Sequence, residues 1–154
     1  MLARGGSRRR QGHSGYYRAV EFWCGRLGLQ LLHRGTETDP DIASLIGEDP
    51  VELVIADLDV GDGRIIELIK YTRPAGRPVR ARSSDPGSTH IALRVDDPGA
   101  APERLEGSEA RQIFRHPVLL HDPGGAWDGV ACCYIADPDG IIVELVQRPG
   151  AEAP

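Results

Sequence analysis

A motif recurs half a chain length later in this sequence, and the repeat limits the folds that the chain can adopt. The stretch Asp62–Ile69 reads DGRIIELI, and the stretch Asp139–Val146, 77 positions later in a chain of 154 residues, reads DGIIVELV. Asp-Gly is typical of a tight turn, and the β-branched and apolar residues after it favour a strand. One period that covers half of a chain of this length indicates two copies of one module.

Each half is predicted to end in a β-hairpin whose last strand carries a glutamate. The second half predicts a strand, a helix and three further strands, at 88–95, 102–106, 112–119, 130–136 and 141–147. The first half predicts an amphipathic helix at 17–27, which Gly28 ends, and strands at 29–34, 51–59 and 64–71, with 40–46 as a candidate short helix. We therefore expect an α+β fold with modules at 17–76 and 87–149, a linker at 77–86, and tails at 1–16 and 150–154.

Charge and cysteine content narrow the classes of partner and compartment. The net charge of −5 at pH 7 argues against a nucleic acid or an anionic membrane as partner. No run of about 18 apolar residues is present, so no transmembrane helix is predicted, and the basic N-terminus lacks the apolar region of a signal peptide. Three cysteines, two of them adjacent, do not form a disulfide framework, so we expect a cytoplasmic protein.

The alternation of side chains along the predicted strands places one histidine and two glutamates on candidate inward faces. Glu67 and Glu144 occupy equivalent positions of the repeat, each flanked by apolar residues, and burying either without a partner would be unfavourable. His90 falls on the strand face opposite to Ile91, and the helix is expected to cover the Ile91 face. A single strand glutamate is usually solvated, but two equivalent glutamates with a histidine predict a divalent metal site.

These motifs resemble those of the vicinal-oxygen-chelate superfamily, which includes glyoxalase I, methylmalonyl-CoA epimerase, bleomycin-resistance proteins and type I extradiol dioxygenases. The similar stretches are 20–29, 66–71 with Pro74, 87–97 and 134–145, within a resemblance that covers roughly 17–149. The resemblance implies two βαβββ modules that form a cupped mixed sheet around a metal ion. It also implies ligands on the first and fourth strands of each module, which here are Glu67, His90 and Glu144.

The N-terminal segment departs from the family's pattern, which would place a histidine and an apolar strand before the first helix. His13 precedes Glu67 by 54 residues, as His90 precedes Glu144, so His13 is the candidate fourth ligand. The residues after His13 lack the apolar run that follows His90. A second explanation is that residues 1–16 are an out-of-frame reading of a GC-rich gene, which tends to give Gly- and Arg-rich stretches; the nucleotide sequence would settle this.

Several other residues are candidates for substrate contact or for proton transfer. The predicted substrate contacts are Tyr71, Arg94, His121 and Trp127. Glu48 and Glu52 are alternatives for a second acid or base. Four residues are predicted to be structural or small core residues: His33, His116, Cys132 and Cys133.

The resemblance implies an isomerase, epimerase or lyase that acts on a small carbonyl compound through a metal-stabilised enolate. The cofactor would be one divalent ion, Zn, Ni, Co, Mn or Fe, with Glu144 as the base and Glu67 as a ligand opposite. An extradiol dioxygenase that uses Fe(II), two histidines and a glutamate is the first alternative. The second is a metal-free drug-binding protein. We also expect a homodimer.

Overall fold

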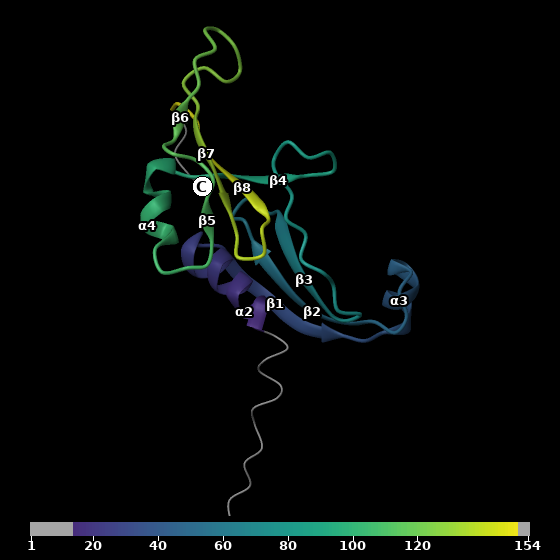
Figure 1. Cartoon of the computed structure of the whole chain (residues 1–154). Helices are drawn as coiled ribbons and strands as arrows, with labels where there is room; N and C mark the ends of the chain where they lie inside the picture. Colours follow the sequence, from purple (N-terminus) through teal and green to yellow (C-terminus); the bar gives the residue numbers. More distant parts are fainter. Residues whose placement is uncertain (1–13, 151–154) are drawn as a thin grey trace, which may run out of the picture. The chain divides into compact units, whose positions relative to one another are not determined.

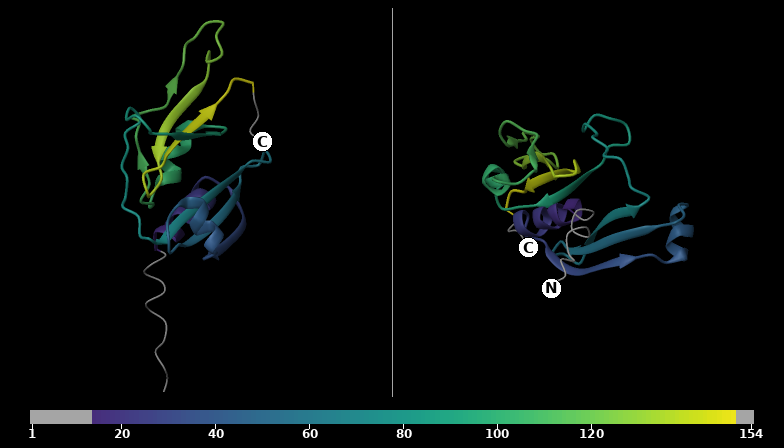
Figure 2. Two further views of the ribbon diagram at one scale, coloured as in Figure 1. Left: turned by 90° about the vertical axis from the view of Figure 1, so that its right-hand side faces the viewer. Right: turned by 60° about the horizontal axis from the view of Figure 1, so that its bottom comes forward.

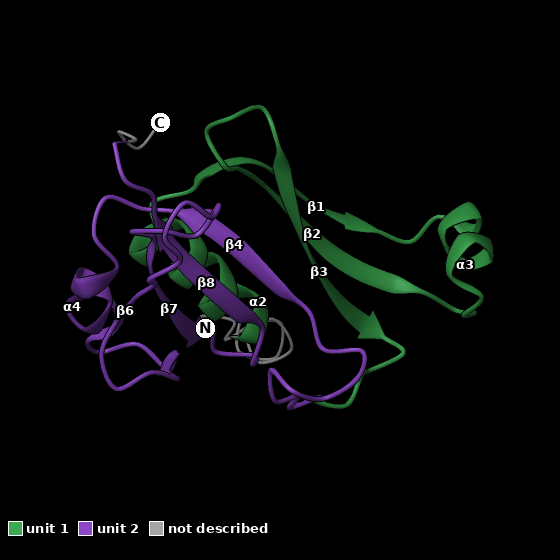
Figure 3. Cartoon of the chain, turned by 90° about the horizontal axis from the view of Figure 1, so that it is seen from above, with its two compact units in different colours: residues 1–78 green, residues 79–154 purple. Residues whose placement is uncertain are grey.

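The computed structural model of the chain describes residues 14–150 and divides the chain into two compact units (Figures 1 and 3). The units are Met1–Pro78 and Val79–Pro154. Each contains its own β-sheet and short helices, so the α+β class predicted from the sequence is confirmed. Among residues 14–150, none of the helices has both the length and the apolar character needed to cross a bilayer.

The first unit is built on a three-stranded antiparallel sheet in the order β1-β2-β3. The strands are β1 (Gln30–Glu37), β2 (Glu52–Asp59) and β3 (Ile65–Arg73). Helix α3 (Pro40–Ile46) connects β1 to β2 at the end of the sheet, as the right-hand view of Figure 2 shows. Its bounds follow from local capping, because the Asp39 side chain accepts the Asp41 N–H and Gly47 supplies a left-handed C-cap.

The helix predicted at 17–27 differs from the observed one in both its start and its hydrogen-bond pattern. Helix α2 (Ser14–Val20) begins three residues earlier and continues as the π-helical segment η1 (Glu21–Arg26). The prediction that residues 14–16 belong to an irregular tail is therefore wrong. Tyr16 is buried and its hydroxyl donates to the Ile55 carbonyl at 2.9 Å, which anchors this first turn on β2.

The π-helical turn explains why two consecutive aromatic residues are both buried in the first unit. The Leu27 N–H donates to the Phe22 carbonyl five residues back, at 3.1 Å, so the turn is wider than an α-helical one. Phe22 and Trp23 are both fully buried, with their rings edge to face. The amphipathic helix predicted at 17–27 assumed an α-helical period throughout.

The second unit has a mixed sheet in the order β4-β8-β7-β5, with β6 also paired to β7. The strands are β4 (His90–Arg94), β5 (Arg111–Gln112), β6 (Val118–Leu119), β7 (Ala131–Ala136) and β8 (Ile142–Gln147). Strand β4 runs parallel to β8, and the other pairs are antiparallel. The helical segments η2 (Pro98–Ala100) and α4 (Ala101–Leu105) follow β4, close to the helix predicted at 102–106.

The single strand predicted at 112–119 is wrong, because the chain forms β5 and β6 with an irregular segment between them. The Ile113 N–H still donates to the Tyr134 carbonyl, but the Gln112 side chain bonds to the Phe114 carbonyl and turns the chain. Pro117 has no N–H with which to continue the ladder. The predicted strand would have included His116. The structure instead places His116 between β5 and β6, where it is exposed.

The two faces of the second sheet have different roles. Leu93, Val143 and Leu145 lie on one face and are buried. The helical segment η2 covers that face, where the Cys133 thiol approaches the Pro98 carbonyl at 3.6 Å. Because side chains alternate along each strand, the opposite face carries His90 and Glu144.

Candidate functional site

His90 and Glu144 lie together on the face of the second sheet opposite to η2. His90 is the first residue of β4 and pairs with Ile142, while Glu144 pairs with Ala92, so the two side chains are diagonal neighbours on adjacent strands. The His90 Nε2 and Glu144 Oε2 atoms are 3.3 Å apart. The His90 side chain is 45% exposed and that of Glu144 is 15% exposed, so the pair opens to solvent on the histidine side.

Strand β7 contributes two further side chains to this face. Tyr134 lies directly opposite Glu144, and its ring packs against the His90 ring with centroids 5.4 Å apart and a 37° tilt. Burial raises the pKa of the Tyr134 hydroxyl, and the negative charges of Glu144 and of ionised Cys132 raise it further. Cys132 pairs with Val146 and is a diagonal neighbour of Glu144. Burial raises the pKa of the Cys132 thiol, and the negative charge of Glu144 raises it further.

The donor atoms of His90 and Glu144 fit the separation that a divalent cation requires. Two ligand atoms about 2.0–2.2 Å from a tetrahedral metal ion are roughly 3.3–3.5 Å apart, which agrees with the 3.3 Å between Nε2 and Oε2. An imidazole and a carboxylate are also ligand types that Zn, Fe, Ni and Co accept. Within residues 14–150, no group of three or more His, Cys, Asp or Glu side chains is arranged to hold a metal ion. The pair therefore supplies part of a ligand set.

Glu67 and Tyr71 occupy one face of β3 in the first unit, as predicted from the alternation of side chains. Glu67 is exposed and lies directly opposite Asp57, and Tyr71 lies opposite Leu53. The assignment of Glu67 as a metal ligand stays a prediction. His13 lies outside the described residues, and the residues that follow it form α2 and not a strand. The assignment of His13 as a ligand also stays a prediction.

The remaining predicted contacts divide between the sheet face and a loop. Arg94 lies on β4, on the same face as His90, and is exposed. The loop between β6 and β7 projects from the sheet (Figure 1). In it, His121 Nδ1 is 3.7 Å from Asp128 Oδ1, and Trp127 lies 5.3 Å from the Arg148 guanidinium carbon in a cation–π contact. These contacts hold the loop to itself and to the end of β8.

Glu48 and Glu52 lie near the start of β2 in the first unit, away from the strand centres. Glu48 lines an open pocket beside α3, together with Pro40 and Asp49. Glu52 is the first residue of β2, where its backbone carbonyl accepts the Thr72 hydroxyl at 3.0 Å. A role for either glutamate in proton transfer stays a prediction.

Sequence reasoning missed Tyr134 and assigned Cys132 to the core. The turn at Asp137–Ile141 pairs Ala136 with Ile142, and this register carries Tyr134 to a position opposite Glu144. The register of that hairpin could have been counted outward from the Asp-Gly turn. Such a count identifies the residues on β7 that share a face with the glutamate.

Comparisons with known proteins show the family to which the chain is similar. The family model described as the Glyoxalase/Bleomycin resistance protein/Dioxygenase superfamily matches residues 14–145. A 2-epi-5-epi-valiolone epimerase from Actinomyces sp is 31% identical over 134 residues, which is 85% of this chain and 72% of that protein. A probable lactoylglutathione lyase from Vibrio cholerae is 24% identical over 88% of this chain and 85% of that protein.

A solved structure supports the same fold. The crystal structure of a glyoxalase family protein from Bacillus cereus matches with a TM-score of 0.70 at 21% identity, over 85% of each chain. At this level of identity the likeness concerns the fold alone.

Proposed function

This chain belongs to the Glyoxalase/Bleomycin resistance protein/Dioxygenase superfamily, and we propose that it is a divalent-metal-dependent isomerase, epimerase or lyase that acts on a small carbonyl compound. The observation that carries the proposal is the His90–Glu144 pair, with ligand atoms 3.3 Å apart and the histidine side chain 45% exposed. The names of the two relatives, an epimerase and a lyase, favour this class of reaction over ring cleavage or drug binding.

His90 Nε2 and Glu144 Oε2 are the atoms that would hold the cation, which could be Zn, Ni, Co, Mn or Fe. When bound, such an ion supplies positive charge next to the carbonyl oxygen of a substrate. Glu67 and His13 remain the predicted additional ligands.

Glu144 is the residue proposed to move the proton. A carboxylate that removes the proton from the carbon next to a carbonyl breaks a C–H bond, and the electron pair moves toward the carbonyl oxygen. Return of the proton to the other face of that carbon gives the epimer, and its return to a neighbouring atom gives an isomer. The exposed, small Ala92 lies directly opposite Glu144 and leaves space for a substrate beside the carboxylate.

Metal binding by the full chain tests the first half of this proposal. Protein stripped with a chelator would be titrated with Zn²⁺ or Co²⁺, and metal per chain would be measured by elemental analysis. We expect about one ion per chain, with affinity reduced in His90→Ala and Glu144→Gln by at least about 100-fold, which is the upper end of the loss from an outer-shell partner. His116→Ala and Glu103→Gln, exposed residues of the same unit, serve as matched controls.

Proton exchange tests the second half. The metal-loaded protein would be incubated in D₂O with 2-epi-5-epi-valiolone or lactoylglutathione, the compounds in the relatives' names, and deuterium at the carbon next to the carbonyl would be followed by NMR. We expect exchange that Glu144→Gln abolishes.

An absence of bound metal in the wild type would refute the proposal and favour a metal-free binding protein. Oxygen consumption with catechols would instead support the dioxygenase alternative.

A further inference from the structure

The ring of Tyr134 contacts the ring of His90 across an intervening strand. Strand β8 lies between β4, which carries His90, and β7, which carries Tyr134. Neighbouring strands are about 4.8 Å apart, so the backbones of β4 and β7 are separated by roughly 9.5 Å. The two ring centroids are only 5.4 Å apart, with a tilt of 37° between the ring planes. Both side chains therefore lean toward each other above β8, on the face that carries Glu144.

The register of the sheet explains how this contact forms. Tyr134 lies directly opposite Glu144, which in turn lies opposite Ala92. His90 lies opposite Ile142, one pair further along the sheet, so Tyr134 and His90 are diagonal to each other. Ala92 is the β4 residue in line with Tyr134, and its methyl group is too short to reach across β8. The tyrosine ring therefore meets the imidazole on the diagonal.

The imidazole of His90 depends on such a contact, because few other groups restrain it. The last side-chain torsion of histidine has broad minima, so the ring turns easily. Histidines that bind metal ions almost always donate their second ring N–H to a carboxylate, a carbonyl or a water molecule, which fixes the ring. Among the described residues, the only polar side-chain contact of His90 is the 3.3 Å approach of its Nε2 atom to Glu144, and the side chain is 45% exposed. Packing against Tyr134 is the second restraint on the orientation of the ring.

We propose that Tyr134 is a positioning residue, whose ring holds the His90 imidazole in the orientation that directs Nε2 toward Glu144 and toward a divalent cation bound between them. This inference rests on the proposed metal-dependent function. The role belongs to the aromatic ring and not to the hydroxyl, because the observed contact is between the two rings.

Metal affinity of Tyr134 variants tests the role of the ring. An aromatic pair changes an equilibrium constant by roughly 2- to 12-fold beyond the effect of its buried area, so we expect Tyr134→Leu to bind Zn²⁺ about three- to tenfold more weakly than the wild type. Tyr134→Phe keeps the ring and should bind within about twofold of the wild type. Tyr17→Leu, which replaces a tyrosine of the first unit that is 55% exposed, is the matched control and should bind as the wild type does.

Nuclear Overhauser contacts between the two rings test the geometry without metal. The ring protons of Tyr134 and His90 should show such contacts in the metal-free wild type, and the contacts should persist with the new ring in Tyr134→Phe. The His90 signals are identified by their loss in His90→Ala. An absence of these contacts in the wild type would overturn the proposal, whatever the variants do to metal affinity.

A double-mutant cycle tests whether Tyr134 acts through His90. In a His90→Ala background, Tyr134→Leu should leave the residual Zn²⁺ affinity unchanged, because the imidazole that the ring positions is gone. A further loss of about threefold or more would mean that Tyr134 acts on another group, such as Glu144 directly opposite, and would overturn the positioning of His90.

The outcomes separate this inference from the proposed function. Zn²⁺ binding by the wild type with equal affinity in Tyr134→Leu would overturn the positioning role alone. Equal losses in Tyr134→Phe and Tyr134→Leu would assign the effect to the hydroxyl and would likewise overturn the role of the ring. Failure of the wild type to bind metal would overturn both the positioning role and the proposed function.

Discussion

The two copies of the repeated hairpin fold alike but place their glutamates in different environments. In both copies the glutamate follows an Asp-Gly turn, and the same backbone hydrogen bond closes the turn. In the first copy the Val60 N–H donates to the Arg64 carbonyl at 3.1 Å, and in the second the Asp137 N–H donates to the Ile141 carbonyl at 2.9 Å. Yet Glu67 is exposed, while Glu144 is 15% exposed and its Oε2 atom lies 3.3 Å from His90 Nε2.

The residues opposite each glutamate account for this difference. Glu67 lies opposite Asp57, a like charge, whereas Glu144 lies opposite Tyr134. Cys132, a diagonal neighbour of Glu144, corresponds to the apolar Ile55 in the first copy. A repeated motif therefore conserves the hairpin, while the residues on the neighbouring strands decide whether its carboxylate can take part in a site.

The two copies also differ in the number of strands that pair with the strand carrying the glutamate. Strand β8 lies between β4 and β7, and β4 brings His90 to Glu144. Within residues 14–150, β3 pairs with β2 alone. Glu144 is consequently an interior residue of its sheet, and Glu67 is on an outer strand of the described sheet.

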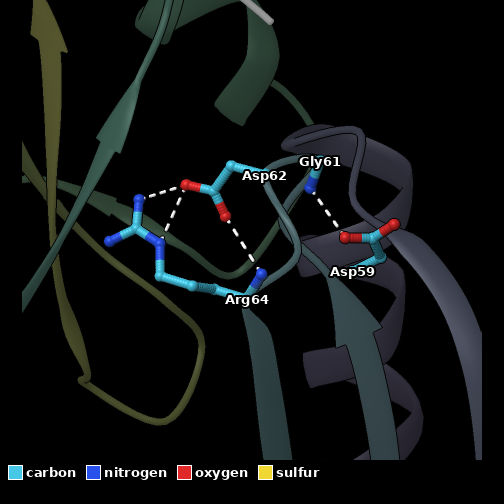
Figure 4. A network of polar contacts seen from close by, with 4 residues as sticks. All are labelled: Asp59, Gly61, Asp62 and Arg64. Carbon is cyan, nitrogen blue, oxygen red and sulfur yellow. Dashed lines mark hydrogen bonds and ion pairs between the residues drawn. The ribbon is translucent and has the colours of Figure 1, made fainter.

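In both turns, side-chain carboxylates accept backbone N–H groups, but the carboxylates come from different positions. In the first, Asp59 accepts the Gly61 N–H at 2.8 Å, and Asp62 accepts the Arg64 N–H at 3.1 Å and forms an ion pair with the Arg64 side chain (Figure 4). In the second, one buried carboxylate, that of Asp137, accepts the N–H groups of the next turn residues. These are Asp139, Gly140 and Ile141, at 2.9, 2.8 and 2.8 Å.

The largest expected effect comes from breaking the second turn. Asp137→Ala should lower the free energy of unfolding by roughly 3 kcal/mol, because hydrogen bonds to a charged group contribute about 1.5–3 kcal/mol each and the site is only 2% exposed to water. Urea-induced unfolding measures the loss. Asp62→Ala in the first turn should have a smaller effect, because water replaces its exposed carboxylate. Equal losses in the two variants would show that the buried Asp137 carboxylate stabilises its turn no more than the exposed Asp62 carboxylate does.

An intermediate effect on the free energy of unfolding is expected from Cys133→Ala, which makes the buried face of the second copy resemble the first. Cys133 corresponds to Ala56 in the first copy. Burial, together with the charges of Cys132, Asp97 and Glu144, raises the pKa of the Cys133 thiol to about 11. The folded chain therefore keeps this proton while the unfolded chain loses it from about pH 9, the ordinary value.

The stability contributed by the neutral thiol is thus complete below pH 9 and is lost as the pH rises toward 11. The loss should be on the order of 1–2 kcal/mol, after allowance for solvent screening. Cys133→Ala should flatten the dependence of unfolding free energy on pH across this range. An unchanged slope in Cys133→Ala would show that other groups cause it.

The smallest expected effect on the free energy of unfolding comes from the two like charges of the first copy, Asp57 and Glu67. Asp57→Asn removes the charge opposite Glu67 and should raise the free energy of unfolding by roughly 0.2–1 kcal/mol, the range for a cross-strand pair. The gain should shrink in high salt, where the repulsion in the wild type is screened. A destabilised Asp57→Asn at low salt would mean that Asp57 has a favourable partner and that its charge does not repel Glu67.

Much of the fold and part of the site could be predicted from the sequence. The repeat predicted both hairpins, the short helix at 40–46 matches α3, and the alternation of side chains correctly put His90 and Glu144 on one face. The π-helical segment was not predictable from an α-helical period, since it depends on how Phe22 and Trp23 pack. The break between β5 and β6 likewise depends on a side-chain hydrogen bond from Gln112.

The sequence by itself determined the duplicated hairpins, because Asp-Gly turns and β-branched runs act through local backbone preferences. Only the tertiary structure decided which glutamate is paired, because a partner for a carboxylate comes from adjacent strands that are distant in the sequence. His90 is 54 residues from Glu144 in the sequence, yet the parallel pairing of β4 with β8 brings their side chains within 3.3 Å. The face on which Cys132 lies depends on the register of the same hairpin and not on its own residue type.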